Sequence, residues 1–356
     1  MALVGCSQKE GKDAATATDT ATAADSVKAQ KRSISLAFVG DMMLGTDFPE
    51  DAGGRYLPAD SGRHVLDGPR EILQRVDIAA GNLEGALGHG GTAKHCNDPK
   101  LCFTFRMPGY MADRLAEAGF DYMNMANNHM LDFGEGGIDA GKRELDRVGI
   151  AYGGVKAGPV YSIVERGGVK VGFTGFSTTD ACHTIHDYDA MVKIVKEMRE
   201  KCDIVVVCIH AGAEGAAYTH VPRKPEIFHG WPRGDVYKFA HTAIDNGADI
   251  VWGHGPHVTR GMELYRDRLI MYSLGNFATP VRMGIAGATG HAPLVEVTVS
   301  PDGKFEKGQI HPFIQQKGVG PVADRSGVVI DQMRRLSRED FPESKLRIEE
   351  NGSVNY

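Results

Sequence analysis

Residue types that bind metal ions recur along this chain, each time at the end of a short apolar run. They are Asp41, Asn82 with Glu84, Asn128 with His129, His210 with Glu214, His254 with His257, and Asn276. Carboxylates and neutral imidazoles together suit Mn, Fe or Zn, whereas an all-oxygen calcium site would not use histidine. Two such ions can share a carboxylate, activate a bridging water and hold a phosphoryl group, while a nearby histidine supplies a proton. The residue types therefore predict a site for one or two divalent ions and a metal-activated water.

The apolar runs that precede these residues have the length of strands. They include residues 34–38, 76–80, 122–125, 203–209, 249–252 and 269–272. Apolar residues at helical spacing lie between several of them, around residues 111–118, 191–198 and 239–244. Strands that alternate with helices predict a largely parallel sheet covered on its faces. In such sheets, sites form beyond the carboxyl ends of the strands, which is where these polar residues fall.

Composition excludes several other classes of protein. The chain has 356 residues, 42% hydrophobic residues and a net charge of −6, so we expect one or two α/β domains. Nucleic-acid binding relies on a large basic excess, which this chain lacks. No apolar run approaches the roughly 20 residues of a membrane-spanning helix. G-x-S-x-G, Walker and G-x-G-x-x-G motifs are absent from the sequence, which weakens the serine-hydrolase, nucleotide-motor and dinucleotide hypotheses.

Histidines also have simpler explanations. A single histidine after an apolar run is usually a core or capping residue, but four such residues in corresponding positions favour one shared site: His129, His210, His254 and His257. His183 and His186 resemble a metal-binding pair, yet their surroundings (residues 178–189) are polar. We expect that pair to lie in a solvated loop.

Seven short motifs, in order and spacing, resemble the CapA/PgsA capsule-synthesis family, which is associated with poly-γ-glutamate and belongs to the calcineurin-like metallophosphoesterase superfamily. The motifs occupy residues 40–45, 82–84, 105–108, 127–134, 210–214, 253–257 and 272–277. The resemblance covers residues 33–313 and implies a four-layer α/β/β/α sandwich with the metals at one edge.

The resemblance also implies a role for each matching residue. Asp41 and His257 would bind the first metal, Glu84 would bridge, Asn128 and His210 would bind the second, His254 would join them, and His129 would be the proton donor. Asn82, Glu214 and Asn276 would support the ligands or face the substrate. Arg106 would bind an anionic substrate or pair with an acid, and Asp132 would orient His129 or cap the following helix.

The chain departs from the superfamily pattern on the first-metal side. Met43 stands where the superfamily has a histidine, Glu84 replaces the usual aspartate, and the segment from His254 to His257 is one residue longer than usual. The first metal site therefore has fewer protein ligands than is usual in the superfamily. We expect one tight and one labile ion, or a single ion.

The two ends of the chain carry weaker signals. Residues 3–6 (Leu-Val-Gly-Cys) resemble a lipoprotein lipobox, and residues 7–30 are too polar to fold, so we interpret residues 1–32 as a truncated lipoprotein leader and disordered linker. A tag or a misplaced start codon is the alternative. Cys96 and Cys102 can form a small disulfide, whereas Cys202 and Cys208 are expected to be buried thiols. Residues 314–356 form an extension without a recognisable motif.

These observations predict a divalent-metal-dependent hydrolase in the bacterial cell envelope, attached to the membrane through a lipid anchor only and facing outside the cytoplasm. Its substrate would be a phosphoester or an amide of an anionic capsule polymer or its precursor, and its partners other capsule synthesis or export proteins. Nucleic acid is not expected as a partner. The alternative is a non-catalytic polymer-binding component of capsule export, and a weaker alternative is a broad-specificity nucleotidase or phosphodiesterase.

Overall fold

Strand β1 (Ile34–Met42) shows why this chain folds into layers. Its side chains alternate between two faces, as in any strand. Leu36 and Phe38 belong to an apolar cluster shared with strands of a second sheet, whereas Ala37 and Val39 belong to a cluster shared with helices.

The computed structural model describes residues 31–96 and 103–356, and Lys31–Tyr356 forms one compact unit.

The first sheet contains β1 and mixes parallel with antiparallel strands. Its parallel half pairs β1 with β2 (Ile78–Leu83), β2 with β5 (Tyr122–Asn124) and β5 with β6 (Ala151–Gly153), and β16 (Asn276–Ala278) pairs with the end of β1. Its antiparallel half runs through β17 (Leu294–Val299), β18 (Phe305–His311), β22 (Ser353–Asn355) and β21 (Arg347–Ile348). The two strands near the end of the chain thus extend this sheet on one side, with β21 at its edge.

The second sheet is smaller and lies against the first. Its order is β14 (Met262–Tyr265), β15 (Arg268–Met271), β13 (Ile250–His254), β10 (Ile204–His210), β8 (Val169–Ser177) and β7 (Tyr161–Arg166). A short strand, β9 (His183–Thr184), pairs with the end of β8. Pairs β15–β13, β13–β10, β10–β8 and β8–β9 are parallel, so these strands finish at one edge.

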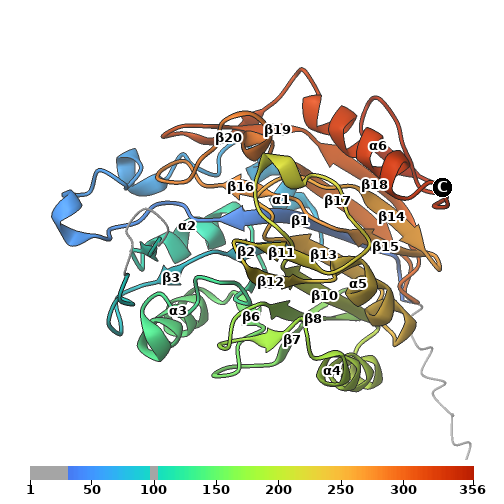
Figure 1. The fold of residues 1–356 in the computed structure, drawn as a ribbon, viewed down its shortest axis with the longest axis horizontal. Coiled ribbons are helices and arrows are strands. Elements are labelled where there is room, and N and C mark those ends of the chain that lie inside the picture. The colour runs from blue at the N-terminus through green and yellow to red at the C-terminus, as the bar shows by residue number, and fades with distance from the viewer. Residues whose placement is uncertain (1–30, 97–102) are drawn as a thin grey trace, which may run out of the picture. The chain divides into compact units, whose positions relative to one another are not determined.

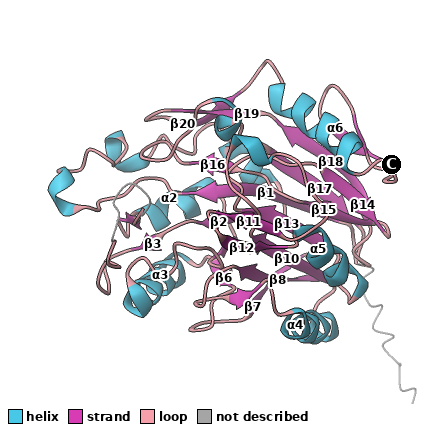
Figure 2. Cartoon of the chain, viewed as in Figure 1, coloured by secondary structure: helices cyan, strands magenta, loops and turns pink. Residues whose placement is uncertain are grey.

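Helices cover the outer face of each sheet. α1 (Arg70–Arg75), α2 (Met111–Ala118) and α3 (Gly134–Val148) pack on the first sheet, and α4 (Tyr188–Lys201) and α5 (Val236–Asp245) pack on the second. Phe38 and Trp252 meet between the sheets, with ring centroids 5.4 Å apart. Figures 1 and 2 show the strands in the middle of the molecule with the helices around them. This arrangement confirms the α/β/β/α sandwich.

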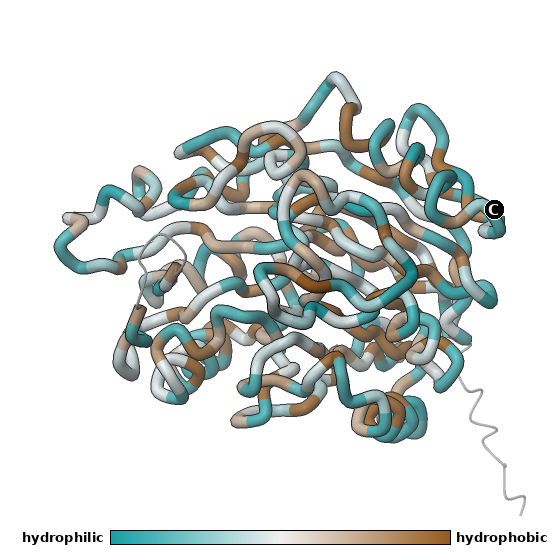
Figure 3. Tube along the Cα trace, viewed as in Figure 1, coloured by the Kyte–Doolittle hydropathy of each residue, from teal (hydrophilic) through white to brown (hydrophobic). Residues whose placement is uncertain are grey.

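Smaller elements complete the fold. α6 (Val328–Asp340) contributes Val329, Ile330 and Met333 to the apolar layer between the sheets. Three two-stranded pairs are β3 (Ala86–Leu87) with β4 (Arg106–Met107), β11 (Glu226–Phe228) with β12 (Trp231–Gly234), and β19 (Phe313–Gln316) with β20 (Gly320–Ala323). Short 3-10 helices occupy Glu50–Ala52, Ala59–Gly62, Ala216–Tyr218 and Gly287–Gly290. Hydrophobic residues concentrate in the strands and hydrophilic ones in the outer loops (Figure 3).

The structure bears on two expectations about the cysteines and the chain ends. Cys202 and Cys208 are buried thiols, as predicted. Cys96 is disulfide-bonded, while Cys102 lies outside the described residues, as does residue 6 with the rest of the predicted leader up to residue 30. Within residues 31–96 and 103–356, no helix has the length and apolar character needed to cross a membrane.

Candidate metal centre

Strand register arranges the polar side chains in two facing rows. The row of the first sheet occupies paired positions on four strands: Asn276, Asp41, Asn82 and Asn124. The row of the second sheet also occupies paired positions on four strands: His254, His210, Ser177 and Thr184. The rows meet between the sheets, where Asn82 Nδ2 lies 3.5 Å from His210 Nδ1.

Most of these residues lie inside the strands, although the sequence pattern places them after the strands. Asp41, Asn82, His210 and His254 are all within the last two residues of their strands. The difference arises because main-chain pairing continues whatever the polarity of the side chain, so an apolar run underestimates the length of its strand. The consequence is a rigid base for the site.

Asp41 is the centre of the cluster and is fully buried. Its Oδ1 accepts a hydrogen bond from Asn82 Nδ2 at 2.8 Å and lies 3.1 Å from His254 Nδ1 and 3.6 Å from His210 Nδ1. Its Oδ2 lies 3.0 Å from His257 Nδ1. Burial alone would raise the pKa of Asp41, but the surrounding imidazoles hold it well below its usual range. Asp41 is therefore an anion whose two oxygens face different histidines.

Glu84 follows β2 and is also fully buried. Its Oε1 lies 3.6 Å from His257 Nε2 and 3.9 Å from both His210 Nε2 and His129 Nε2. Burial, and then the negative charge of Asp41, raise the pKa of Glu84 well above its usual range. In the absence of an added positive charge, two carboxylates this close cannot both ionise freely.

Four buried atoms of this cluster have no hydrogen-bond partner: both carboxylate oxygens of Glu84, Asn128 Oδ1 and His210 Nε2. Each unpartnered buried polar group costs about 1–3 kcal/mol, so proteins rarely retain them without a reason. Burial lowers the pKa of His210 to about 3, so its imidazole is neutral, as a metal ligand must be. Carboxylate, amide oxygen and neutral imidazole are ligands of Mn, Fe and Zn. The residues therefore fit a divalent cation.

Two groups of side chains have ligand atoms close enough to share an ion. One consists of Asp41, His210 and His254, and the other of Asp41, Glu84 and His257, with ligand atoms within 4.8 Å of one another in each group. The second group is the set that the sequence resemblance assigns to the first metal. Asp41 also reaches the histidines of the other site, which the sequence alone does not show. Met43, at the position where a further histidine is expected, is fully buried.

His257 holds an unusual backbone conformation, with φ of +57° directly after Pro256 and Gly255. Left-handed backbone is costly for a residue with a Cβ and persists where the surroundings enforce it. Its Nδ1 lies 2.9 Å from Asn276 Oδ1, and its Nε2 lies 4.0 Å from Glu214 Oε2. Burial would lower the pKa of His257, but the charges of Glu84, Asp41 and Glu214 raise it to about 10. The cluster thus demands positive charge.

His129 stands at the side of this cluster in a well-supported position. Its Nδ1 lies 2.8 Å from Asp132 Oδ2, which leaves Nε2 facing Glu84. Asp132 is fully buried, accepts a hydrogen bond from Phe105 N at 2.7 Å and pairs with Lys94 Nζ at 2.5 Å. α3 begins at Gly134 without a side-chain cap, so Asp132 orients His129 and does not cap the helix.

The guanidinium of Arg106 is already paired with carboxylates of this chain, so it is not free to bind an anion. Its Nε donates to Asp47 Oδ1 at 2.7 Å and its Nη2 to Glu50 Oε1 at 2.8 Å, and the guanidinium lies 4.9 Å from the centre of the Phe133 ring. Of the two roles that the sequence left open, the structure shows the pairing with acids.

Several polar residues of the site carry no strong signal in the sequence. Asn127 Nδ2 donates to Leu83 O at 2.7 Å and to Asn82 Oδ1 at 3.2 Å, and Asn124 Nδ2 donates to the same Oδ1 at 2.8 Å. Lys94 also belongs to the site through Asp132. Asn124 ends an apolar run as the ligands do and could have been found that way. Lys94 lies in a loop-like polar stretch, and nothing in the sequence marks it.

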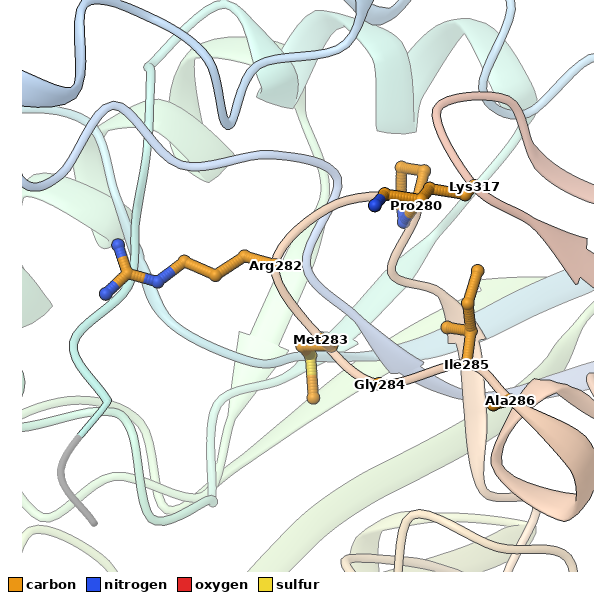
Figure 4. A pocket seen from close by; sticks show the side chains of 7 residues that line it. All are labelled: Pro280, Arg282, Met283, Gly284, Ile285, Ala286 and Lys317. Carbon is orange, nitrogen blue, oxygen red and sulfur yellow. The ribbon is translucent and has the colours of Figure 1, made fainter. Parts of the chain in front are cut away.

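Two other features lie apart from the centre. His183 pairs with Phe176, which belongs to the apolar layer under α4 and α5, and His186 is exposed; neither belongs to a metal-competent group among the described residues. A hollow of about 380 Å³ follows β16, lined by residues 280–286 without Val281, and by Lys317 (Figure 4). No predicted metal ligand lines this hollow. In Figure 4, Arg282 extends away from the other lining side chains, and its Nη1 donates to Phe48 O at 2.7 Å.

Two curated relatives are similar to this chain over about two thirds of its length. The chain is 29% identical to "PGA biosynthesis protein CapA" of Bacillus subtilis (strain 168), over 68% of this chain and 63% of that protein. It is 30% identical to "Capsule biosynthesis protein CapA" of Bacillus anthracis, over 70% of this chain and 60% of that protein. The chain therefore spans about three fifths of the length of these curated relatives.

Solved structures that align with this chain share less sequence identity with it. A hypothetical protein from Thermus thermophilus aligns with a TM-score of 0.49 and 16% identity, over 79% of this chain and all of that one. The calcineurin-like phosphoesterase YfkN from Bacillus subtilis aligns with a TM-score of 0.45 and 11% identity, over 87% of this chain and 99% of that one. The family model described as "Bacterial capsule synthesis protein PGA_cap" matches residues 35–280. The chain belongs to this family of bacterial capsule synthesis proteins.

Proposed function

We propose that this protein is a divalent-metal-dependent hydrolase of capsule synthesis. It cleaves a phosphoester, or an amide, of an anionic capsule polymer or its precursor. The observation that supports the proposal most is the set of unpartnered buried atoms on Glu84, Asn128 and His210, beside a histidine that is held in place by Asp132. A protein that only binds a polymer has no use for a buttressed imidazole at such a site.

Each residue has a definite part in this proposal. Asp41, Glu84 and His257 would hold one ion, and Glu84, Asn128, His210 and His254 would hold the other if a second ion binds. Bound divalent cations lower the pKa of a bound water and stabilise developing negative charge. Asn82 and Asn276 fix the orientation of Asp41 and His257 through hydrogen bonds, and Glu214 adds negative charge beside His257.

His129 donates the proton that the leaving group needs. Its Nε2 faces the cluster, and its Nδ1 is occupied by Asp132 at 2.8 Å. Asp132 holds the ring in one orientation and stabilises the imidazolium, without itself taking the proton. Lys94 and Phe105 N fix Asp132 in turn.

A non-catalytic role in polymer binding or export is the second candidate, and one observation favours it. Met43 is fully buried where the superfamily has a histidine, which leaves the first ion with Asp41, Glu84 and His257. A weakly held first ion would reduce turnover while leaving the fold and polymer binding intact.

One experiment separates the two candidates. The protein is loaded with Mn, Fe or Zn, its metal content is measured by mass spectrometry, and hydrolysis of aryl phosphoesters, nucleotides and poly-γ-glutamate is assayed. We expect metal-dependent hydrolysis that falls by about 10²–10⁴-fold in His129→Ala, with metal content unchanged. His220→Ala, an exposed histidine paired with Asp340, is the matched control. Metal-loaded protein that binds the polymer but hydrolyses none of these compounds favours the export role.

The capsule relatives imply association with the cell envelope. We propose that Cys6 carries a lipid anchor, that the folded unit faces outside the cytoplasm, and that it works with other capsule synthesis or export proteins. Expression of the full-length gene with Cys6→Ser tests the anchor, because the variant is expected in the soluble fraction and the natural protein in membranes.

A further inference from the structure

Cys208 lies directly behind the metal centre. It is fully buried on β10, two residues before His210, so both side chains point into the space between the sheets. Its Sγ lies 2.8 Å from His254 Nε2. Cys208 pairs with Trp252 across the sheet, and His254 is two residues further along β13, so the thiol and the imidazole are diagonal neighbours on one face.

The two nitrogens of His254 face different surroundings. Nδ1 lies 3.1 Å from Asp41 Oδ1 and 2.8 Å from His210 Nδ1, on the side of the ion site. Nε2 faces Cys208. Because a nitrogen that binds a metal uses its lone pair, coordination through Nδ1 requires the ring hydrogen to sit on Nε2. That hydrogen then points at the sulfur.

We propose that Cys208 is a positioning residue for His254, whose Nε2–H donates to Sγ and keeps Nδ1 turned toward the ion. This inference rests on the proposed function, since it needs the ion to be bound. Metal-binding histidines usually donate their second N–H to a carboxylate, a carbonyl or water, and loss of that partner commonly weakens metal binding about 10–100-fold. A thiol sulfur is a weaker acceptor that fills the same place here.

Packing is the competing explanation for a buried cysteine, because a thiol also fills space in the core. Cys202 provides the matched comparison. It is a buried thiol two residues before β10, 6% exposed, in the apolar cluster with α4, and it belongs to neither metal-competent group. Its replacement perturbs packing near the same strand without touching His254.

Three variants separate the hydrogen bond from packing. Cys208→Val keeps an apolar side chain of similar size and removes the acceptor, whereas Cys208→Ser keeps an acceptor and loses volume. The affinity for Mn or Zn is measured by competition with a chelator, and the rise in Tm on metal addition is measured for each variant. We expect Cys208→Val to bind the ion about 10–100-fold more weakly, Cys208→Ser within a few-fold of the natural protein, and Cys202→Ser unchanged.

Equal affinity of Cys208→Val and the natural protein overturns the inference, as does an equal loss in the valine and serine variants. A second readout needs no variant: nitrogen NMR of the zinc-loaded natural protein should show His254 with its hydrogen on Nε2, and a hydrogen on Nδ1 overturns the inference. Natural protein that binds no ion overturns the metal centre and this inference together. Ion binding without hydrolysis overturns only the proposed enzymatic activity.

Discussion

Four aspartates stand at the beginnings of parallel strands, at the edge of the sheets opposite the metal centre: Asp77, Asp121, Asp203 and Asp249. Each clamps one residue of the neighbouring strand in the same way. The Asp249 N–H donates to Val205 O, and its Oδ2 accepts from Val205 N, both at 2.8 Å. Ser35, Ala79 and Lys170 are held likewise by the other three aspartates.

Cationic side chains complete these clamps. Asp249 pairs with Arg199 Nη1 at 2.6 Å and with Arg268 Nε at 3.0 Å. Asp77, Asp121 and Asp203 pair with Arg32, Arg166 and Lys31, respectively. The carboxylates at the beginnings of the strands are therefore satisfied by the protein itself.

The ends of these parallel strands show the opposite situation. Glu84, Asn128 and His210 leave buried polar atoms without partners, and the carboxylates are surrounded mainly by imidazoles and amides. The comparison teaches that a buried polar group alone does not identify a functional site. What distinguishes the ends of these strands is the concentration of unpartnered atoms on side chains that can bind a metal ion, beside a second buried carboxylate.

The largest effect is expected at the ends of the strands. His210→Ala removes a proposed ion ligand. Metal affinity should therefore fall roughly 1,000-fold, on the order of 4 kcal/mol, which is more than the loss of a supporting residue causes. The metal-free protein should lose less stability, because the cost of the cavity and of the lost contact with His254 is partly offset by removal of the unpartnered Nε2. Chelator competition and urea unfolding measure the two quantities, with His220→Ala as control. A large stability loss without a change in affinity would contradict the comparison.

The reverse pattern is expected at the beginnings of the strands. Asp249→Ala removes a buried carboxylate that accepts from Val205 N and pairs with the partly exposed Arg199 and Arg268, so the expected cost of losing all these contacts is about 3 kcal/mol. Metal affinity should be unchanged because the centre lies at the other end of β13. Urea unfolding measures the loss of stability, and metal titration measures the affinity. Asp331→Ala, on the exposed surface of α6, is the control, and an equal loss there would remove the distinction.

Metal addition should raise the free energy of unfolding of the natural protein by slightly less than Asp249→Ala lowers it. An ion that binds only the folded state, at 100 times its Kd, adds about 2.7 kcal/mol to the free energy of unfolding. Chelation should reverse the gain, and Asp249→Ala should keep all of it. Thermal unfolding with and without metal tests this, and a gain that survives in His210→Ala would place the ion elsewhere.

The smallest effect concerns Asp77. The hydrogen bond from Arg32, with further bonds from Ser35, lowers its pKa to about 2. Because this carboxyl has a lower pKa in the folded state, its ionised form stabilises the fold at pH values above the unfolded pKa of about 3.9. The stabilisation is lost as the pH falls through the folded pKa of about 2. Asp77→Asn should therefore lower the free energy of unfolding by about 1 kcal/mol at pH 7, after allowance for solvent screening.

The difference between Asp77→Asn and the natural protein should shrink between pH 4 and pH 2. Urea unfolding at pH 7, 4 and 3 tests this, with Asp331→Asn as the surface control. A pH-independent difference would show that Asp77 acts through shape and backbone hydrogen bonding instead of charge.

Much of the fold and site could be predicted from the chain alone. Apolar runs and helical periodicity indicated the covered sheets, and the ordered motifs indicated the four layers and the capsule family. The same motifs brought Asp41, Glu84, His210 and His257 into one set, and the structure brings these four together. These side chains meet because residues at corresponding positions of neighbouring parallel strands lie at one edge of the sheet. Their roles as ligands stay a prediction.

Other features could not be predicted because they depend on pairs of strands far apart in the sequence. The contact of Cys208 with His254, the support of Asp132 by Lys94 and the pairing of Arg106 with Asp47 each need a register or a loop path that no local pattern contains. The aspartate clamps are of the same kind: Asp249 reads as the start of a strand, while its partner Val205 lies 44 residues earlier.

The sequence by itself determined which chemistry the chain can perform, because residue type fixes which atoms can bind an ion or carry a proton. Tertiary structure decided which buried polar groups are left for that chemistry. The carboxylates at the beginnings of the strands and those at their ends are the same kind of group, and only their three-dimensional neighbours determine whether their hydrogen bonds are satisfied.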